Sequence, residues 1–150
     1  MSPSQVTIEV IWQDDDMVEV KACATNSEFS GETRVYTVYE DLKSLADELQ
    51  GFPRNTSHEV RFEAGVRSRD SYFGIRFYCF DNAAHTAAQV QAESNVPTEF
   101  RREEKHAVTL EVHFEPSAVD EFAAQLRRLV ESKSGSATLV GVGPNTRNIP

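Results

Sequence analysis

The sequence has few of the residues that would assign it to a chemical class. It holds only two cysteines, Cys23 and Cys79, far apart and without a CxxC motif, which argues against a disulfide scaffold or a cysteine-bound zinc. Because each lies in an apolar strand pattern, we expect both to be reduced residues of the core. No apolar run approaches the roughly 20 residues that span a bilayer, and the first residues lack a signal-peptide pattern. The expected compartment is the cytoplasm.

Motifs that bind nucleotides or metals are missing from the sequence as well. There is no GxGxxG and no GxxxxGK[ST], and the glycines of VGVGPN lead into no predicted helix. The four histidines form no HxH or HExxH pattern. A metal site built from Asp81 and His85 with His113 or His106 would rest on tertiary proximity alone. We therefore predict no cofactor and no metal.

Basic side chains are scarce in the first third of the chain. Residues 1–50 carry 11 carboxylates against three basic groups, whereas residues 51–150 are nearly balanced, and the chain has a formal net charge of -9. An excess of this sign repels phosphate backbones and speeds encounter with basic proteins. Direct binding of nucleic acid is therefore disfavoured, although the sequence contains a local basic cluster of Arg61, Arg67, Arg69 and Arg76. Solubility alone is the simplest alternative meaning of the charge.

Alternation of apolar and polar residues predicts most of the chain as strands. Residues 6–12 alternate so that Trp12 falls on the inward face, as an anchor of the core. A turn of three aspartates separates this strand from the next, which is typical of a hairpin. Further strands are predicted at about 18–25, 33–38, 58–64, 72–80, 85–93 and 108–114.

Two segments have the spacing of amphipathic helices. A leucine stripe after Val38 predicts a helix that ends at Gly51, because glycine readily takes the left-handed conformation that follows a helix. A second helix is predicted over about 117–132. The strands do not alternate with helices, so the sheet is expected to be antiparallel. The predicted fold class is α+β, a single domain with a largely antiparallel sheet of about six to seven strands and two amphipathic helices packed on it.

The C-terminal segment is punctuated by glycine and serine. We predict that residues 1–132 form the single α+β domain. Residues 133–150 are predicted to be a mobile C-terminal tail, apart from a short apolar stretch at 138–142.

A particular order of short features runs along residues 6–131. It consists of Trp12 before an acidic turn, a helix closed by Gly-Phe-Pro, a turn from Asp81 to His85, and a last strand that leads through Glu-Pro into the final helix. In this order the chain resembles a group of small, uncharacterised bacterial α+β domains, some of them found in toxin-immunity gene neighbourhoods. The resemblance implies a stoichiometric binder and no chemistry. Related turns often carry glycine before the histidine, whereas Ala84 takes that place here, which leaves the turn geometry open.

The stretch CFDNAAHTAAQVQ brings a thiol, a carboxylate and an imidazole close together, at Cys79, Asp81 and His85. A nucleophilic cysteine needs a base within hydrogen-bond reach. In a hairpin with its turn at about 81–84, Cys79 opposes Thr86 and Phe80 opposes His85, so the pleat puts thiol and imidazole on opposite faces. The stretch therefore predicts a core cysteine and a turn. No catalytic residue is assigned, and a non-enzymatic role is favoured.

The acidic group of Asp14, Asp15 and Asp16 with Glu40 and Asp41 is the strongest functional candidate. A solvated hairpin tip is the simpler structural explanation. As a functional feature, the group forms a docking edge for Lys and Arg of a partner. The leading hypothesis is a non-catalytic protein-interaction module, such as an immunity protein that binds a basic toxin domain. An uncovered edge strand would also allow a homodimer.

A small-molecule-binding or enzymatic domain is the alternative hypothesis. Its site would use the open face of the sheet, lined by Tyr36, Tyr72, Arg76, Tyr78 and His85. The two hypotheses have different structural requirements. A protein binder needs an exposed charged surface, whereas a ligand-binding domain needs an apolar cavity with converging polar groups.

Overall fold

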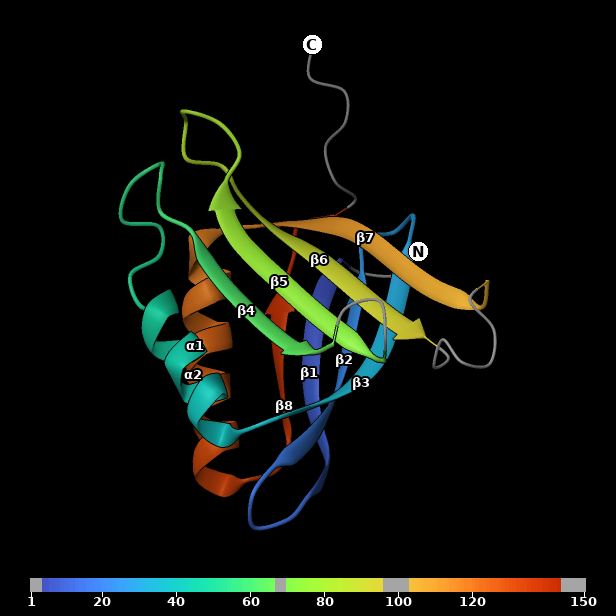
Figure 1. Cartoon of the computed structure of the whole chain (residues 1–150). Coiled ribbons are helices and arrows are strands. Elements are labelled where there is room, and N and C mark those ends of the chain that lie inside the picture. Colours follow the sequence, from blue (N-terminus) through green and yellow to red (C-terminus); the bar gives the residue numbers. More distant parts are fainter. Residues whose placement is uncertain (1–3, 67–69, 96–102, 144–150) are drawn as a thin grey trace.

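The computed structural model describes residues 4–66, 70–95 and 103–143, and within them the chain forms a mixed set of strands and helices (Figure 1). In chain order these are β1 (Gln5–Gln13), β2 (Val18–Thr25), β3 (Ser30–Thr37), α1 (Tyr39–Leu49), β4 (Val60–Gly65), β5 (Tyr72–Cys79), β6 (Thr86–Asn95), β7 (Lys105–Phe114), α2 (Pro116–Ser132) and β8 (Ser136–Val140). Every strand and helix expected from periodicity is present. The α+β class is confirmed.

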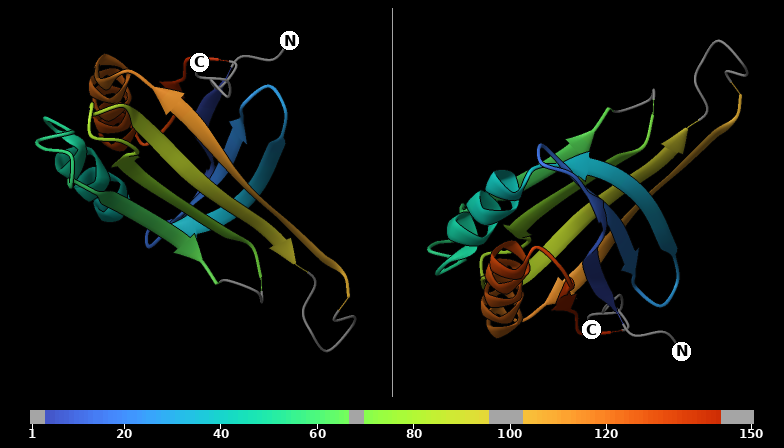
Figure 2. Two further views of the ribbon diagram at one scale, coloured as in Figure 1. Left: turned by 90° about the horizontal axis from the view of Figure 1, so that it is seen from above. Right: turned by 90° about the horizontal axis from the view of Figure 1, so that it is seen from below.

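The strands form two antiparallel sheets of four strands each, and the prediction of one sheet with six to seven strands is wrong. Sheet A has the order β3-β2-β1-β8, and sheet B has the order β4-β5-β6-β7. The two sheets face each other, and β3 lies against all four strands of sheet B (Figure 2). The apolar face of each sheet is therefore covered mainly by the other sheet.

The two helices carry the chain from one sheet to the other. α1 joins β3 of sheet A to β4 of sheet B, and α2 returns from β7 to β8. The helices pack on each other, with α1 beside β4 and α2 beside β8, so they cover one side of the space between the sheets (Figure 1). Gly51 has a φ of 75° after α1, as the sequence predicts. In the described part of the chain, no helix combines the length and apolar character needed to cross a membrane.

One core lies between the sheets and the helix pair. Val6, Ile8 and Val20 of sheet A face an aromatic group of sheet B and α2 that includes Phe73, Phe77, Phe114 and Phe122, all with little or no exposed surface. Two polar contacts add to this packing, because the Thr33 hydroxyl donates to the Glu93 carbonyl and the Asn26 amide donates to the Glu111 carbonyl. The sheets are thus held by apolar burial and by a few cross-sheet hydrogen bonds.

An irregularity in β1 changes the direction of its last residues. The pairing of β1 with β2 shifts register between Val10 and Trp12, which is a β-bulge that adds one residue to β1. Trp12 then lies opposite Glu19 and is 47% exposed. The prediction that Trp12 anchors the core is wrong, because the extra residue moves the ring to the outer face of sheet A.

The segment after residue 132 contributes to the fold. β8 pairs with β1 along its whole length, and Ala137 and Leu139 are fully buried. Ordered structure therefore continues beyond residue 132, in the part of the predicted tail that contains the apolar stretch 138–142. Of the predicted tail, residues 144–150 lie outside the described residues.

Candidate functional site

The tip of the β1–β2 hairpin is built on the first of its three aspartates. The Asp14 carboxylate accepts the backbone N–H of Asp16 and of Met17, each at 2.8 Å. These hydrogen bonds favour the charged form and lower the pKa of the Asp14 carboxyl. Asp14 is therefore a turn residue. The side chains of Asp15 and Asp16 have no hydrogen-bond or ion-pair partner among the described residues.

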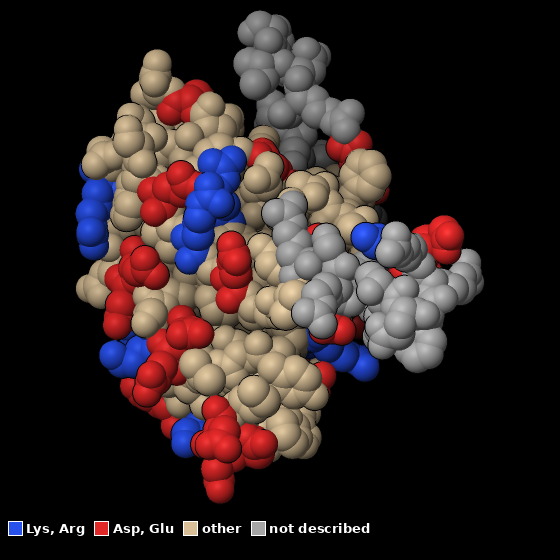
Figure 3. Space-filling model, viewed as in Figure 1, with Lys and Arg blue, Asp and Glu red and all other residues tan. Residues whose placement is uncertain are grey.

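A hollow of about 580 Å³ lies beside this tip, between the hairpin and the start of α1. Its lining includes all three aspartates of the turn, Glu40 and Lys133. Acidic side chains dominate this end of the molecule in the space-filling view, where the hairpin projects downward (Figure 3). The structure thus brings Glu40 to the aspartates that the sequence grouped with it. Asp41 lies in the first turn of α1 and is not part of the lining.

The hairpin is fixed to both helices next to the hollow. Gln13 donates from its amide to the Lys133 carbonyl at 2.8 Å, and its amide oxygen accepts from the Tyr39 hydroxyl at 3.0 Å. Tyr39 begins α1, and Lys133 follows α2. One glutamine side chain therefore ties the base of the hairpin tip to an end of each helix, which orients the acidic residues above it.

An exposed aromatic pair lies at the same end of sheet A. Trp12 and Tyr36 are 47% and 51% exposed, and their rings meet edge to face with centroids 6.1 Å apart. Both lie opposite Glu19 of β2, one on each side of it. We define the docking surface as Trp12, Tyr36, Glu19, Asp15 and Asp16. Sequence periodicity missed Trp12, although the unbroken apolar run of Val10, Ile11 and Trp12 is itself a departure from alternation.

The residues proposed for the alternative ligand site do not surround one cavity. Tyr36 is on the outer face of sheet A, whereas Tyr72, Arg76 and Tyr78 follow one another along the outer face of β5 in sheet B. The hollow above β5 has a volume of only about 40 Å³, well below the roughly 300 Å³ of a small ligand site. His85 lies elsewhere, at the β5–β6 turn.

The side chains on the outer face of β5 are engaged with one another. The Tyr78 hydroxyl donates to the Glu111 carboxylate, and the Arg76 guanidinium lies 3.8 Å from the centre of the Tyr78 ring. Burial and the nearby Glu111 charge raise the pKa of Tyr78 to about 12. Glu59 accepts ion pairs from both Arg61 and Arg76. Glu59 therefore partly neutralises the positive charge of Arg61 and Arg76, two of the four arginines of the basic cluster. The other two, Arg67 and Arg69, lie outside the described residues.

The stretch with Cys79, Asp81 and His85 forms the expected hairpin. Cys79 pairs with Thr86, and the Phe80 N–H donates to the His85 carbonyl at 2.9 Å, so the predicted register is confirmed. The Asp81 carboxylate accepts backbone N–H groups of the turn and approaches His85 Nδ1 at 2.6 Å. Ala84 has a φ of 64°, the left-handed conformation that glycine favours at such a place. The turn therefore keeps a glycine-like geometry.

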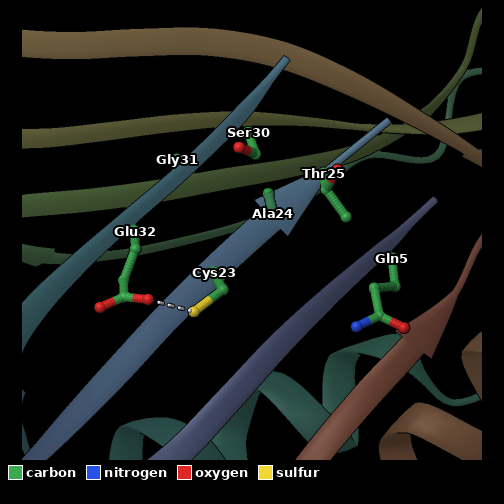
Figure 4. A pocket seen from close by; sticks show the side chains of 7 residues that line it. All are labelled: Gln5, Cys23, Ala24, Thr25, Ser30, Gly31 and Glu32. Carbon is green, nitrogen blue, oxygen red and sulfur yellow. Dashed lines mark hydrogen bonds between the residues drawn. The ribbon is translucent and has the colours of Figure 1, made fainter. Parts of the chain in front are cut away.

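Neither cysteine is a fully buried core residue, which corrects the prediction for both. Cys79 is partly exposed at the end of β5, and burial raises the pKa of its thiol. Cys23 is on the outer face of sheet A and donates to Glu32 of the neighbouring strand at 3.4 Å, and both residues line a hollow of about 330 Å³ (Figure 4). Burial and the Glu32 carboxylate raise the pKa of Cys23 to about 11. Both thiols are therefore held in the protonated, weakly nucleophilic form at neutral pH.

A metal site built from Asp81 and His85 with His113 or His106 is the metal hypothesis raised by the sequence. Asp81, His85 and His113 do lie around one hollow, but each imidazole is stacked on the Phe80 ring. Over residues 4–66, 70–95 and 103–143, no group of three or more His, Cys, Asp or Glu side chains has an arrangement that could hold a metal ion.

Comparison of the chain with protein-family models, with curated proteins and with solved structures finds no match in any of the three.

Proposed function

We propose that this chain is a non-catalytic protein-interaction module that binds a partner with a basic surface. One observation carries the proposal: the exposed rings of Trp12 and Tyr36 touch each other beside the acidic hairpin tip. Tryptophan and tyrosine are among the side chains most often found as binding hot spots. Carboxylates at the rim of such a site raise the association rate with a cationic partner. Aromatic anchors and an acidic rim together favour a protein surface rich in Lys and Arg.

The partner we propose is a basic toxin domain. This part of the proposal rests on the resemblance of the chain to bacterial domains from toxin-immunity gene neighbourhoods, together with the formal net charge of -9. An immunity protein acts by occluding its toxin, so it needs affinity and fast association and requires no catalytic residue. An edge-strand homodimer through β3, β4, β7 or β8 remains a separate prediction.

The aromatic part of the docking surface is tested with the product of the gene adjacent to the one that encodes this chain. Trp12→Ala is expected to weaken binding at least about 30-fold, because a hot-spot aromatic contributes about 2 kcal/mol or more. Phe29→Ala is the matched control, since Phe29 is 61% exposed in the β2–β3 turn, at the other end of sheet A. Surface plasmon resonance gives both affinities. Equal binding by Trp12→Ala and the wild type would remove the aromatic pair from the interface.

The acidic part of the docking surface is tested by the salt dependence of the association rate. The double substitution Asp15→Asn with Asp16→Asn is expected to slow association and to flatten its decline with salt. Asp14 is left unchanged because it holds the turn. Asp120→Asn with Glu121→Gln makes the same change in charge on the exposed side of α2 and serves as the control. If the adjacent gene product neither binds nor is inhibited, the toxin-immunity assignment fails.

A further inference from the structure

A second hollow is lined by residues of the β5–β6 turn and of the start of α2. These elements lie at the opposite end of the molecule from the hairpin tip (Figure 1). Its volume is about 420 Å³, and most of its wall is apolar, from residues that include Phe80, Phe114, Pro116 and Val142. Small-molecule sites typically have volumes of about 300–1,000 Å³, apolar walls and a few converging polar groups. This hollow has that size and composition.

A row of three flat rings forms one wall of the hollow. The Phe80 ring stacks on His85 and on His113, with centroid distances of 5.8 and 4.8 Å and an interplanar angle of 23° in each pair. The His85 side chain at the end of the row is 66% exposed. One face of its imidazole therefore meets Phe80, and the rest is available to another flat ring.

The polar groups of the hollow favour a ligand that donates hydrogen bonds. His85 Nδ1 lies 2.6 Å from Asp81, so in the neutral imidazole Nδ1–H donates to the carboxylate and Nε2 is left as an acceptor. The Thr86 hydroxyl already donates to the Phe114 carbonyl at 2.6 Å. The Glu115 carboxylate at the mouth has no hydrogen-bond or ion-pair partner among the described residues. The unengaged groups, His85 Nε2 and Glu115, thus both accept.

We propose that this hollow binds a small organic cation that carries a flat aromatic ring, such as an aromatic amine. The ring extends the stacked row beyond His85, and the ammonium group donates to Glu115 and to His85 Nε2. Charge complementarity favours this class over an aromatic carboxylate, because Asp81 and Glu115 give the mouth a negative charge. The hollow is separate from the docking surface, so the two proposals stand or fall independently.

The probes are tryptamine, indole-3-propionate and n-butylammonium, titrated into isotope-labelled protein at pH 8. Tryptamine is expected to bind saturably with a Kd between about 0.05 and 1 mM, which is the range for a ligand of this size. Its NMR shift changes should centre on Phe80, His85 and Glu115. Indole-3-propionate, which lacks the cation, and n-butylammonium, which lacks the ring, should each bind at least about fivefold more weakly.

Substitutions at Glu115, which directly precedes α2, and within α2 test the position of the ammonium group. Glu115→Gln keeps the shape of the side chain and should weaken tryptamine about fivefold, because it removes a charge-assisted hydrogen bond. Glu121→Gln makes the same change on the exposed side of α2 and should leave the Kd unchanged. The proposal is overturned if tryptamine does not saturate, if the anion or the ring-free amine binds equally well, or if Glu115→Gln has no more effect than Glu121→Gln. Shift changes centred on the acidic hairpin tip would overturn it as well.

Discussion

The outer faces of the two sheets carry similar residues in opposite states. On sheet B, Tyr72 is only 5% exposed, and Tyr78 is bonded to Glu111 beneath the Arg76 guanidinium. On sheet A, Tyr36 is 51% exposed, and the one ring contact recorded for it in the described structure is with Trp12, itself largely exposed. The tyrosines of β5 in sheet B are therefore covered or bonded within the sheet, whereas sheet A leaves an aromatic pair open to solvent.

The difference shows which tyrosines are available for binding. The Tyr72 ring lies over Gly74 of the same strand, and a Cβ at Gly74 would collide with that ring. The Tyr72 ring occupies the space that a side chain at residue 74 would take, so it packs on the sheet and is buried. Nothing comparable covers Tyr36 in the described residues, since its neighbours along β3 on the same face are charged. Residue type alone therefore does not identify a binding surface, because the neighbours on the face decide it.

The largest expected effect contrasts Tyr72 with Tyr36 in stability. Tyr72→Ala should lower the free energy of unfolding by about 3 kcal/mol, because it removes a buried ring above Gly74. Tyr36→Ala should lower it by less than about 1 kcal/mol, because most of that ring is in water. Urea unfolding followed by circular dichroism measures both changes. Equal losses would mean that the two faces do not differ as described.

An intermediate effect on stability is expected from the Tyr78–Glu111 hydrogen bond, and it should depend on pH. Because the pKa of Tyr78 is raised to about 12 in the folded chain, the folded state keeps a proton that the unfolded state loses above about pH 10. The stabilisation of the folded state by protonated Tyr78 is therefore complete below about pH 10 and is lost as the pH rises through about 12. Tyr78→Phe should cost about 1 kcal/mol at pH 8 and should remove this part of the alkaline loss. Tyr36→Phe is the control, and an identical alkaline profile for both variants would contradict the assignment.

The smallest expected effect concerns the Cys23 thiol on sheet A. Glu32→Gln removes the acceptor and the charge that help to raise the pKa of Cys23 to about 11. The rate of alkylation at pH 8.5 should therefore rise about threefold to tenfold, since the thiolate is the reactive form. The experiment uses a Cys79→Ser background, so that one thiol is labelled. Glu19→Gln, on the same face but away from Cys23, should leave the rate unchanged, and an equal rise would assign the effect to net charge.

The strands and helices follow from local periodicity, but their division into two sheets does not. The alternation in each strand shows only which of its faces is apolar. That pattern is the same whether a helix or another sheet covers the apolar face. The width of a seven-stranded sheet, compared with the width that two helices can cover, favours two sheets. Seven strands at about 4.8 Å make a face about 34 Å wide, whereas two helices of about 10 Å diameter cover about 20 Å. The remaining apolar surface requires a second sheet.

The candidate site was half predictable for a similar reason. The cluster of Asp14, Asp15 and Asp16 is visible in the sequence, as is its position in a hairpin turn. Its aromatic neighbour was assigned to the core because alternation was continued through Ile11, where the β-bulge lies. A bulge adds one residue, so every later side chain of the strand changes face. The apolar run of Val10, Ile11 and Trp12 departs from alternation, but such a run is equally typical of a strand covered on both faces. The special role of Asp14 as a turn acceptor also required the backbone geometry.

The pairing of β8 with β1 has a consequence for the order in which the protein matures during synthesis. β1 is synthesised long before β8, yet the two strands pair, with Val6 opposite Leu139. Closing so long a loop costs chain entropy and makes folding slower. Sheet A, which carries the proposed docking surface, is therefore completed only after sheet B and both helices have been made. A chain that stops before β8 would lack a finished sheet A, so the proposed binding would require synthesis through β8.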